Sequence, residues 1–402
     1  MKILIITQYF WPENFRVNDL SLALKKRGHS VSVLTGIPNY PQGKYYDKYK
    51  FYNKKIEFWN NIKIYRSFLF PRGKGGGIRL ILNYLTFAIF ASIKLFFIKE
   101  KFDKVIVYQL SPATVGIPGV IAKKIFNSSL VFYIQDLWPE SLKDAGGINS
   151  KFIFKIIDKL MNYFYDKSNL ILVQSEEFIG FLIKKGVNKS KIKYLPNTVE
   201  NFYKPVNILE KYSSKFPEGF NILFAGNIGV AQDFNTIIKS AKILHKKKYN
   251  INWVILGDGR DKKNIIKNIH LNNLDSRFHF LGSFPSKDMP YFFSCADLLL
   301  ISLKKSSVFS ITIPSKLQSY LACKKPLIGN VDGVASKIIN KSGAGLSSES
   351  GDSLSLANNI EIMFKTEKSQ LNNYSNSGFT YFKKNFDRNI VYSNLEFFLN
   401  SI

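Results

Sequence analysis

Short apolar runs alternate with longer amphipathic segments along most of the chain. This alternation predicts strands that are each followed by a helix, the pattern of βαβ units in a parallel sheet. The helix after the first strand, for example, places Val17, Leu20 and Leu24 on one face. It ends in cationic side chains followed by Gly28, as helix C-termini prefer. In the first half, strands are expected at 3–6, 31–34, 62–66, 105–108, 130–134, 170–173 and 192–195.

The alternation stops once and then begins again, which predicts two domains. Residues 201–217 are largely polar and contain two prolines, as a linker does. A chain of 402 residues is also long for one domain and suits two of roughly 200 residues each. We expect an N-terminal α/β domain at 1–200, a C-terminal one at 213–378, and a helix at 379–402 that returns to the first domain. Strands of the second domain are expected at 222–225, 253–256, 278–281, 298–301 and 327–328.

The chain is strongly basic, with a formal net charge of +28 from 57 Lys and Arg against 29 Asp and Glu. This charge favours anionic partners, such as phosphorylated substrates or an acidic membrane surface. Nucleic acid is disfavoured, because the aromatic residues lie in apolar runs rather than among basic clusters. The two cysteines exclude a disulfide framework and a thiolate zinc site. The first apolar run is too short for a signal peptide, so we expect a cytoplasmic location.

The segment Leu80–Ile98 contains one charged residue, Lys94, and is flanked by basic residues. Its length is near the roughly 20 residues that a membrane-spanning helix needs. A crossing would put half of one sheet across the bilayer, because the segment lies between two expected strands. We therefore favour a helix in the membrane interface, with its basic flanks on anionic headgroups. A buried core helix is the alternative, although its aromatic residues exceed what one sheet face covers.

Two glycine loops in the second half follow expected strands, where open parallel sheets bind ligands. The first, Phe224–Gln232, contains Gly226 and Gly229, which let the backbone approach an anion at the start of the next helix. The second, Leu256–Arg260, suits contact with a base or a phosphate. Such turns also occur where nothing binds, so neither loop is specific alone.

A third loop leads into a helix that begins near Pro314 and Ser315, which puts Lys316 in its first turn. A cation there opposes the helix dipole, so structure alone does not favour it. A diphosphate at that helix N-terminus reverses the balance, because the lysine and the amides share the anion. A solvated surface lysine is the alternative. Since no Asp-x-Asp pair occurs in the chain, we expect a phosphorylated ligand held between two domains without a bridging metal.

Several motifs stand in one order from residue 1 to about 330. They are Met1–Glu13, Arg27–Pro41, Asp136–Ser141, Pro196–Thr198, Gly226–Gly229 with Gln232, Gly257–Gly259, and Ile313–Lys316 before Tyr320–Ala322. With these motifs the chain resembles retaining GT-B glycosyltransferases of family 4, most closely the WbuB-like branch that builds O-antigen and capsule.

The resemblance implies two Rossmann-like domains that face each other across a cleft, with the nucleotide sugar in the second and the acceptor in the first. It implies retention of anomeric configuration without metal or cofactor, and we expect a UDP-linked donor. Such enzymes extend polyprenyl-diphosphate-linked sugars from the inner face of the cell membrane, which suits the basic charge and the 80–98 helix. Members of this branch are often described as N-acetyl-L-fucosamine transferases, so that sugar is the one expected.

The resemblance places the donor site in the second domain, with departures. The family has an Arg and a Lys in the first glycine loop, where Asn227 and Gln232 stand here, so Lys316 remains as the main, catalytic cation. The family's paired glutamates are missing, which leaves Gln318 and Ser319 as candidates for the ribose. The expected donor-binding residues are Gly226, Asn227, Gly229, Gln232, Gly257, Gly259, Arg260, Ser315, Lys316, Gln318 and Ser319.

In the first domain, Asp136 is the expected catalytic residue on the acceptor side, where it orients or deprotonates the acceptor hydroxyl. The family commonly has a histidine just before it, and this chain has Gln135. Capping of the helix near Pro139 is the alternative role for Asp136. Acceptor contacts are expected from Glu13, Asn14, Arg16, Asn39 and Tyr40.

Two other functions stay open at this point. A sugar-nucleotide 2-epimerase has a similar scaffold, but it changes the donor without any acceptor. A non-catalytic homologue that only binds an anion is consistent with the missing glutamates.

Overall fold

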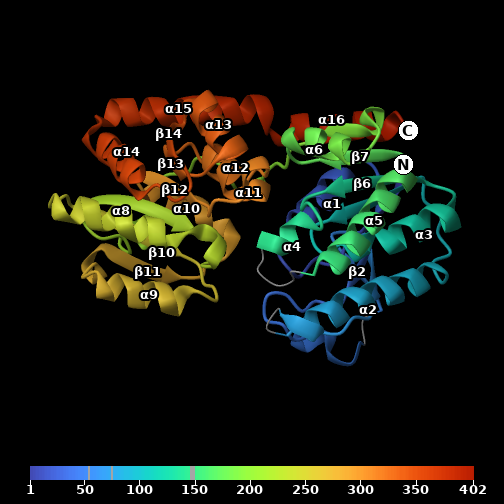
Figure 1. Cartoon of the computed structure of the whole chain (residues 1–402). Coiled ribbons are helices and arrows are strands. Elements are labelled where there is room, and N and C mark those ends of the chain that lie inside the picture. The colour runs from blue at the N-terminus through green and yellow to red at the C-terminus, as the bar shows by residue number, and fades with distance from the viewer. Residues whose placement is uncertain (53–54, 74–75, 145–149) are drawn as a thin grey trace. The chain divides into compact units, whose positions relative to one another are not determined.

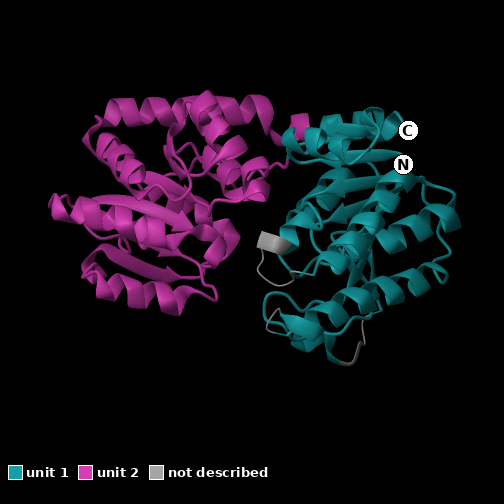
Figure 2. Ribbon diagram, in the orientation of Figure 1, with its two compact units in different colours: residues 1–196, 392–402 teal, residues 197–391 magenta. Residues whose placement is uncertain are grey.

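The computed structural model describes the chain except for residues 53–54, 74–75 and 145–149. It divides into two compact units (Figure 2), residues 1–196 with 392–402, and residues 197–391. We call them unit 1 and unit 2. The last helix supplies the final residues of unit 1, whereas residues 379–391 belong to unit 2.

Unit 1 is built around one sheet (Figure 1). Its strands join in the order β3-β4-β2-β1-β5-β6-β7-β8. All neighbours are parallel except β3 and β4, and every expected strand is present. The sequence reasoning missed β3. It pairs with β4 through a hairpin at Asn60 and Asn61, which both have positive φ, as a type I′ turn requires. The strands are β1 (Lys2–Ile6), β2 (Ser30–Gly36), β3 (Ile56–Trp59), β4 (Ile62–Ser67), β5 (Lys104–Gln109), β6 (Ser129–Ile134), β7 (Leu170–Val173) and β8 (Ile192–Tyr194).

The helices of unit 1 pack on this sheet and on each other. They are α1 (Arg16–Lys26), α2 (Gly77–Leu95), α3 (Gly116–Phe126), α4 (Glu140–Asp144), α5 (Lys151–Lys167) and α6 (Glu177–Lys184), joined by most of α16 (Arg388–Asn400). Polar contacts hold α16: the Glu396 carboxylate binds Arg27 and His29, and the Tyr392 hydroxyl donates to Asp19 at 2.7 Å. Residues far apart in sequence thus complete unit 1.

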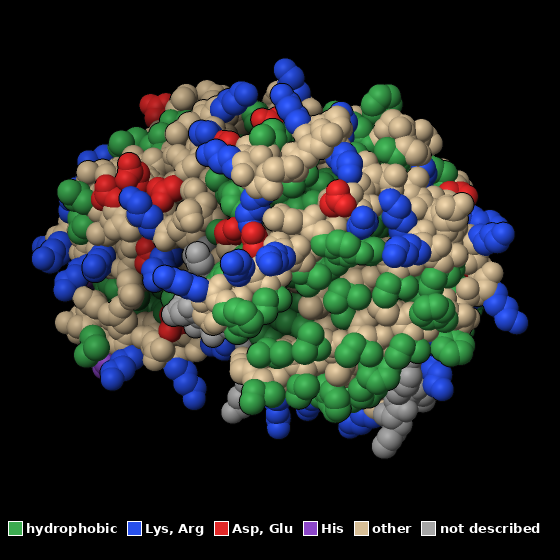
Figure 3. All heavy atoms as spheres, turned by 45° about the vertical axis from the view of Figure 1, so that its right-hand side comes forward, with side chains coloured by type: hydrophobic (Ala, Val, Ile, Leu, Met, Phe, Trp, Pro, Cys, Tyr) green, Lys and Arg blue, Asp and Glu red, His purple; other side chains and the backbone are tan. Residues whose placement is uncertain are grey.

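Helix α2 has two unlike faces. Phe87, Ala91 and Leu95 are fully buried where α2 packs on unit 1. The opposite face exposes apolar side chains, including Ile78 at 75% and Ile89 at 54%, and Figure 3 shows hydrophobic side chains gathered there. Within the described residues, α2 is long and apolar enough to cross a membrane, with 39% of its apolar window buried. The buried face ties it to the sheet, and the exposed face is left uncovered.

Unit 2 contains a second, fully parallel sheet in the order β11-β10-β9-β12-β13-β14. Its strands are β9 (Phe220–Ala225), β10 (Ile251–Leu256), β11 (Phe278–Gly282), β12 (Leu298–Ser302), β13 (Leu327–Asn330) and β14 (Gly345–Ser348). The strand order reverses between β9 and β12, and such a switch point is where doubly wound sheets bind ligands. The edge strand β14 was not expected, because its Gly-Leu-Ser-Ser sequence lacks an apolar run.

The segment expected to be a linker, 201–217, packs into unit 2 instead. The ring of Tyr212 is stacked 5.2 Å from Tyr291, and Tyr203 stacks on Phe293. Its aromatic residues therefore bury against α10, despite the polar residues between them. The helices of unit 2 are α7 (Glu210–Ser213), α8 (Phe234–Lys246), α9 (Lys262–Leu271), α10 (Met289–Cys295), α11 (Ser307–Ile311), α12 (Ser315–Ala322), α13 (Gly333–Ser342), α14 (Ser353–Lys365) and α15 (Lys368–Asn385).

Candidate active site

In unit 2, the loops after β9 and β10 are joined backbone to backbone. The Gly226 N–H donates to Leu256 at 2.9 Å, and the Ile228 N–H donates to Asp258 at 2.9 Å. A Cβ on Gly257 would lie 1.9 Å from the Gly226 oxygen, and Gly257 has a φ of +127°. A Cβ on Gly259 would likewise lie 2.0 Å from the Ile228 oxygen. Glycine is therefore required at 257 and 259 for the two loops to touch, independently of any ligand.

The Gly226 turn keeps some backbone donors available. The N–H groups of Asn227 and Gly229 donate to none of the described residues, whereas that of Gly226 is already used. The next helix does not start as expected. A short 3-10 turn intervenes, and Asp233 occupies the α8 N-cap, where its carboxylate accepts from Thr236 at 2.6 Å. Because an acid already sits at this positive helix end, the α8 terminus is not the anion site that we expected.

Lys316 lies in the first turn of α12, as expected, and reaches the Gly226 turn. A Cβ on Gly226 would lie 2.5 Å from the Lys316 Cε. The Lys316 ammonium donates to the Gln232 Oε1 at 2.6 Å and lies 3.7 Å from the centre of the Phe224 ring. It forms no ion pair within the described chain. Burial lowers the pKa of Lys316 to about 7, so this amine is poised to gain a proton when an anion arrives.

The remaining expected donor residues divide into buried and exposed ones. The Gln318 amide donates to the Asn197 carbonyl at 2.7 Å, and the Ser319 hydroxyl donates to the Ser315 carbonyl at 3.3 Å. Both side chains are buried and bonded to main-chain carbonyls, which leaves them poor candidates for the ribose. Asn227 and Arg260 are exposed.

Two further contacts, which sequence reasoning missed, complete this edge of unit 2. The buried Tyr320 hydroxyl accepts from the Ala225 N–H at 3.1 Å and so fixes α12 against β9. The Lys304 N–H donates to the Ala231 carbonyl at 2.9 Å, which joins the loops on the two sides of the switch point. In the described part of the chain, no three His, Cys, Asp or Glu side chains gather as metal ligands.

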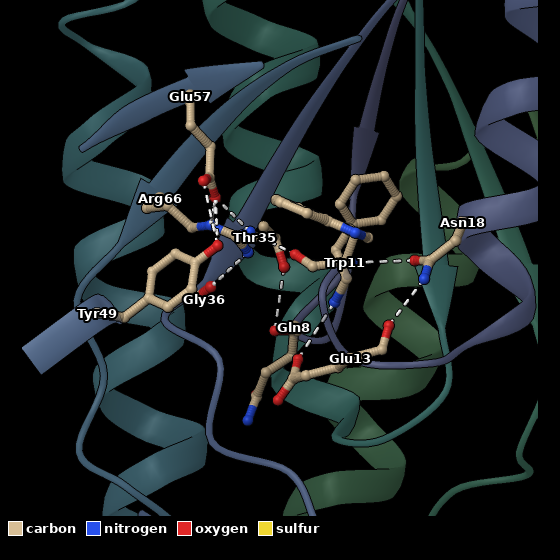
Figure 4. A network of polar contacts seen from close by, with 10 residues as sticks. Gln8, Trp11, Glu13, Asn18, Thr35, Gly36, Tyr49, Glu57 and Arg66 are labelled. Atoms are coloured by element: carbon tan, nitrogen blue, oxygen red, sulfur yellow. Dashed lines mark hydrogen bonds and ion pairs between the residues drawn. The ribbon is translucent and has the colours of Figure 1, made fainter. Parts of the chain in front are cut away.

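In unit 1, Glu13 closes the loop that follows β1 (Figure 4). Its carboxylate, 1% exposed, accepts the N–H groups of Phe10 at 3.3 Å, Asn39 at 2.8 Å and Tyr40 at 2.7 Å. Burial raises the pKa of Glu13 to about 7, against the opposing effect of these hydrogen bonds and of Arg66. Glu13 was expected to contact the acceptor, and the structure uses it to hold the backbone.

Arg66 on β4 is fully buried in the same network (Figure 4). Its Nε donates to the Glu57 carboxylate at 2.6 Å, and its other nitrogens donate to the carbonyls of Gly36 and Trp11. The Tyr49 hydroxyl donates to the same carboxylate at 3.1 Å. This arginine is neutralised and fully hydrogen-bonded, so it is structural.

A second arginine belongs to an aromatic group, which we call the Tyr40 cluster: Tyr9, Phe15, Tyr40 and Arg72. The Tyr9 and Phe15 rings stack at 5.2 Å, and Phe15 lies 5.3 Å from Tyr40. The Arg72 guanidinium lies 4.9 Å from the centre of the Tyr40 ring, and its Nη1 donates to the Tyr9 hydroxyl at 3.4 Å. Of these four residues, the sequence predicted an acceptor contact only for Tyr40, because the cluster joins three separate loops.

The other expected acceptor residues surround this cluster. Asn39 is fully buried, and its Oδ1 accepts the Arg72 N–H at 3.1 Å. Asn14 is exposed and Arg16 is half-buried at the start of α1. Thus Glu13 and Asn39 position the loops, while Tyr40, Asn14 and Arg16 reach the surface.

Asp136 follows β6, where it is half-buried and has no hydrogen bond or ion pair to the described residues. Burial raises the pKa of Asp136 to about 7. Its carboxylate accepts no N–H of the described part of α4, so nothing here supports the capping role. Gln109, at the end of neighbouring β5, is fully buried, and its amide has no partner in the described chain. Two polar side chains with unused bonding capacity therefore lie at the carboxyl ends of neighbouring strands in unit 1.

Comparisons with known proteins agree with this architecture. Residues 15–201 match the glycosyltransferase family 4 domain, and residues 208–378 match the glycosyl transferases group 1 domain. The chain thus contains two glycosyltransferase domains. A protein of Escherichia coli named as a colanic acid biosynthesis glycosyl transferase, WcaI, is 24% identical over 80% of this chain and 81% of its own length. An uncharacterized glycosyltransferase of Methanocaldococcus jannaschii is 28% identical, over 41% of this chain and 42% of its own length.

Solved structures of glycosyltransferases share the fold. Sucrose-phosphate synthase from Thermosynechococcus elongatus has a TM-score of 0.76 at 14% identity, over 100% of this chain and 98% of that one. Anabaena HepE in complex with UDP has a TM-score of 0.72 at 16% identity, over the whole of both chains. The α/β fold of GT-B type is therefore confirmed, and this glycosyltransferase is related to an enzyme named for polysaccharide biosynthesis.

Proposed function

We propose that this glycosyltransferase moves a sugar from a nucleoside diphosphate to a polyprenyl-diphosphate-linked saccharide, with retention of configuration and without a metal. The position of the Lys316 ammonium is the observation that carries the proposal. Its ammonium is held beside the Gly226 turn, bonded to a neutral amide rather than to an acid. A desolvated cation of this kind weakens the folded state, so its place indicates an anionic ligand.

A UDP-linked donor is the simplest ligand for this site. HepE, which shares the fold, was solved with UDP and with UDP-glucose. In this chain, the free N–H groups of Asn227 and Gly229 and the Lys316 ammonium suit the two phosphates.

The reaction that we propose is a front-face displacement. The acceptor hydroxyl oxygen forms a bond to the anomeric carbon while the bond from that carbon to the β-phosphate oxygen breaks. The hydroxyl proton passes to the leaving phosphate, whose charge Lys316 stabilises. No enzymic nucleophile is required, and Asp136 orients the acceptor hydroxyl for this transfer.

We place the protein on the cytoplasmic face of the cell membrane, held by the exposed face of α2. Its uncovered apolar side chains and the net charge of +28 suit an interface with anionic lipids. A polyprenyl-linked acceptor would be reached from that surface. The relationship to WcaI supports a role in polysaccharide biosynthesis, which we assign to O-antigen or capsule, with N-acetyl-L-fucosamine as the sugar to test first.

The test is a donor screen with a short polyprenyl-diphosphate sugar as acceptor, read by mass spectrometry. We expect an acceptor mass increase for one donor, unchanged activity in EDTA, and a retained anomeric configuration by NMR. Lys316→Ala should abolish transfer while the protein stays folded. The control variant Lys242→Ala, on the exposed side of α8, should keep its transfer activity. A donor that changes in the absence of any acceptor would instead identify an epimerase.

A further inference from the structure

Arg72 differs from the other arginine of the same edge, Arg66. Arg66 is fully buried and pairs with the Glu57 carboxylate at 2.5 Å. Arg72 is half-buried and forms no ion pair within the described chain; its guanidinium lies over the Tyr40 ring and donates to the Tyr9 hydroxyl. Stacking over a ring leaves the edge of a guanidinium available to an anion. Its positive charge is therefore uncompensated.

The position of Arg72 is fixed from both sides. Its main-chain N–H donates to the buried Asn39 side chain at 3.1 Å. The next residue, Gly73, donates to the Gly43 carbonyl at 2.9 Å, and a Cβ on Gly43 would clash with Gly73 at 1.8 Å. The partner ring is fixed as well, because the Tyr40 N–H is bonded to the Glu13 carboxylate. Such support from neighbouring backbone and side chains is typical of residues that are held in place to bind a ligand.

The segment that carries Arg72 also adjoins the exposed apolar face of α2. The Phe90 ring on α2 lies 5.1 Å from Phe68, which lies 5.4 Å from Phe70. The Phe70 N–H donates to the Thr86 hydroxyl of α2 at 3.0 Å. Phe90 and Phe70 are 40% and 48% exposed. Exposed aromatic rings thus lead from α2 to the segment that carries Arg72.

We infer that Arg72 binds the diphosphate of the polyprenyl-linked acceptor while the prenyl chain lies along α2 and the Phe68–Phe70 rings. The inference rests on the proposed function, which supplies the acceptor class. A guanidinium matches phosphate oxygens with two parallel hydrogen bonds, and an aromatic step next to it suits a prenyl chain leaving the bilayer. An ordinary phospholipid headgroup offers the same phosphate chemistry, so the experiment separates the two.

The full-length protein is bound to phosphatidylcholine vesicles that contain either undecaprenyl diphosphate or phosphatidylglycerol at matched total charge. We expect wild type to bind the diphosphate vesicles at least tenfold more tightly. Arg72→Gln should remove this preference, and Arg72→Lys should restore part of it. Lys101→Gln, which removes an exposed charge just beyond α2, should weaken both vesicle types equally. Melting temperatures check that each variant is folded.

Two results would overturn the inference: wild type without a preference, or an Arg72→Gln variant that keeps it or loses both affinities equally. The transfer assay, run in parallel, distinguishes the two levels. If wild type transfers sugar but shows no preference for diphosphate vesicles, the Arg72 site is refuted and the proposed function is retained. If the vesicle preference depends on Arg72 but the protein transfers sugar to no acceptor, the proposed function is refuted and the Arg72 site is retained.

Discussion

The two units share a doubly wound topology, but the edges that we propose to bind ligands are built in opposite ways. In unit 2, the edge is made of backbone: loops after β9 and β10 touch through glycines, and Lys316 is the cation set against them. In unit 1, the edge is made of side chains: Glu13 and Arg66 fasten the loops from inside, and the Tyr40 cluster faces outward.

The difference follows from what each edge is proposed to bind. A nucleoside diphosphate presents the same phosphates whatever sugar it carries, so backbone N–H groups and one lysine suffice. Acceptors differ between enzymes, and side chains held on a fixed frame can change without rebuilding the loops. Substitutions at the two edges should therefore fail in different ways.

The largest effect is expected for Lys316→Met in unit 2. Losing the cation that stabilises the leaving phosphate should lower kcat by roughly 10²–10³-fold. The melting temperature should stay the same or rise, because an apolar side chain replaces a desolvated amine. Kinetics and thermal melting check the two parts. A variant that unfolds, or one with normal turnover, would show that the lysine is structural or solvated.

The next effect distinguishes what the backbone fold requires at Gly257 from what ligand binding requires. Gly257→Ala places a Cβ 1.9 Å from the Gly226 oxygen at a φ of +127°, so it should destabilise the protein by about 3 kcal/mol or more, even without ligand. Gly180→Ala is the matched control in unit 1, because no atom lies within 4 Å of its new Cβ on α6. That variant should be more stable by about 0.5–1 kcal/mol. Denaturant unfolding measures the change in unfolding free energy for both variants. A change of the same sign in the two variants would contradict the geometry.

A smaller effect concerns proton uptake at the donor site. The free-protein pKa of Lys316 is lowered to about 7, and a bound diphosphate should raise it. UDP binding should therefore take up a proton above pH 7, and its affinity should fall by about tenfold per pH unit there. Calorimetry in two buffers of different ionisation enthalpy detects the proton. Lys316→Met should bind UDP weakly, with no such slope.

How far the sequence predicted each edge reflects the same contrast. Gly226, Gly257 and Lys316 were found because glycine loops and helix starts are short, local patterns. The alternation predicted both sheets, yet it missed the hairpin strand β3 and the polar edge strand β14.

The Tyr40 cluster was beyond such reasoning, because Tyr9, Tyr40 and Arg72 meet only after β1, β2 and β4 align. Glu13 was identified for the wrong reason: a carboxylate in a loop after a strand suggests a ligand, and its burial depends on contacts with a second loop. The expectations for the α8 terminus and for the linker differ from the structure for the same reason. The position of Asp233 at the α8 N-cap and the packing of Tyr212 depend on local geometry that residue spacing does not specify.

The smallest effect tests whether Glu13 is a fastening residue. Glu13→Gln keeps an oxygen for the N–H groups of Asn39 and Tyr40, but its NH₂ group then faces the Phe10 N–H. This one lost hydrogen bond should cost about 1 kcal/mol of unfolding free energy. The transfer reaction should keep its KM for the donor, because the donor edge lies in the other unit.

The pH dependence of this variant shows whether Glu13 fastens the loops or is available to bind a ligand. Burial raises the folded-state pKa of Glu13 to about 7, above its unfolded value of 4.5. Between these values the folded protein holds a proton that the unfolded chain has released, so wild-type stability falls as the pH rises. Glu13→Gln lacks this slope, and its deficit relative to wild type should shrink from pH 5 to pH 8 in urea unfolding. A deficit that grows with pH would mean that the ionised carboxylate is favoured in the fold, and Glu13 would then be better placed to bind ligand than to fasten loops.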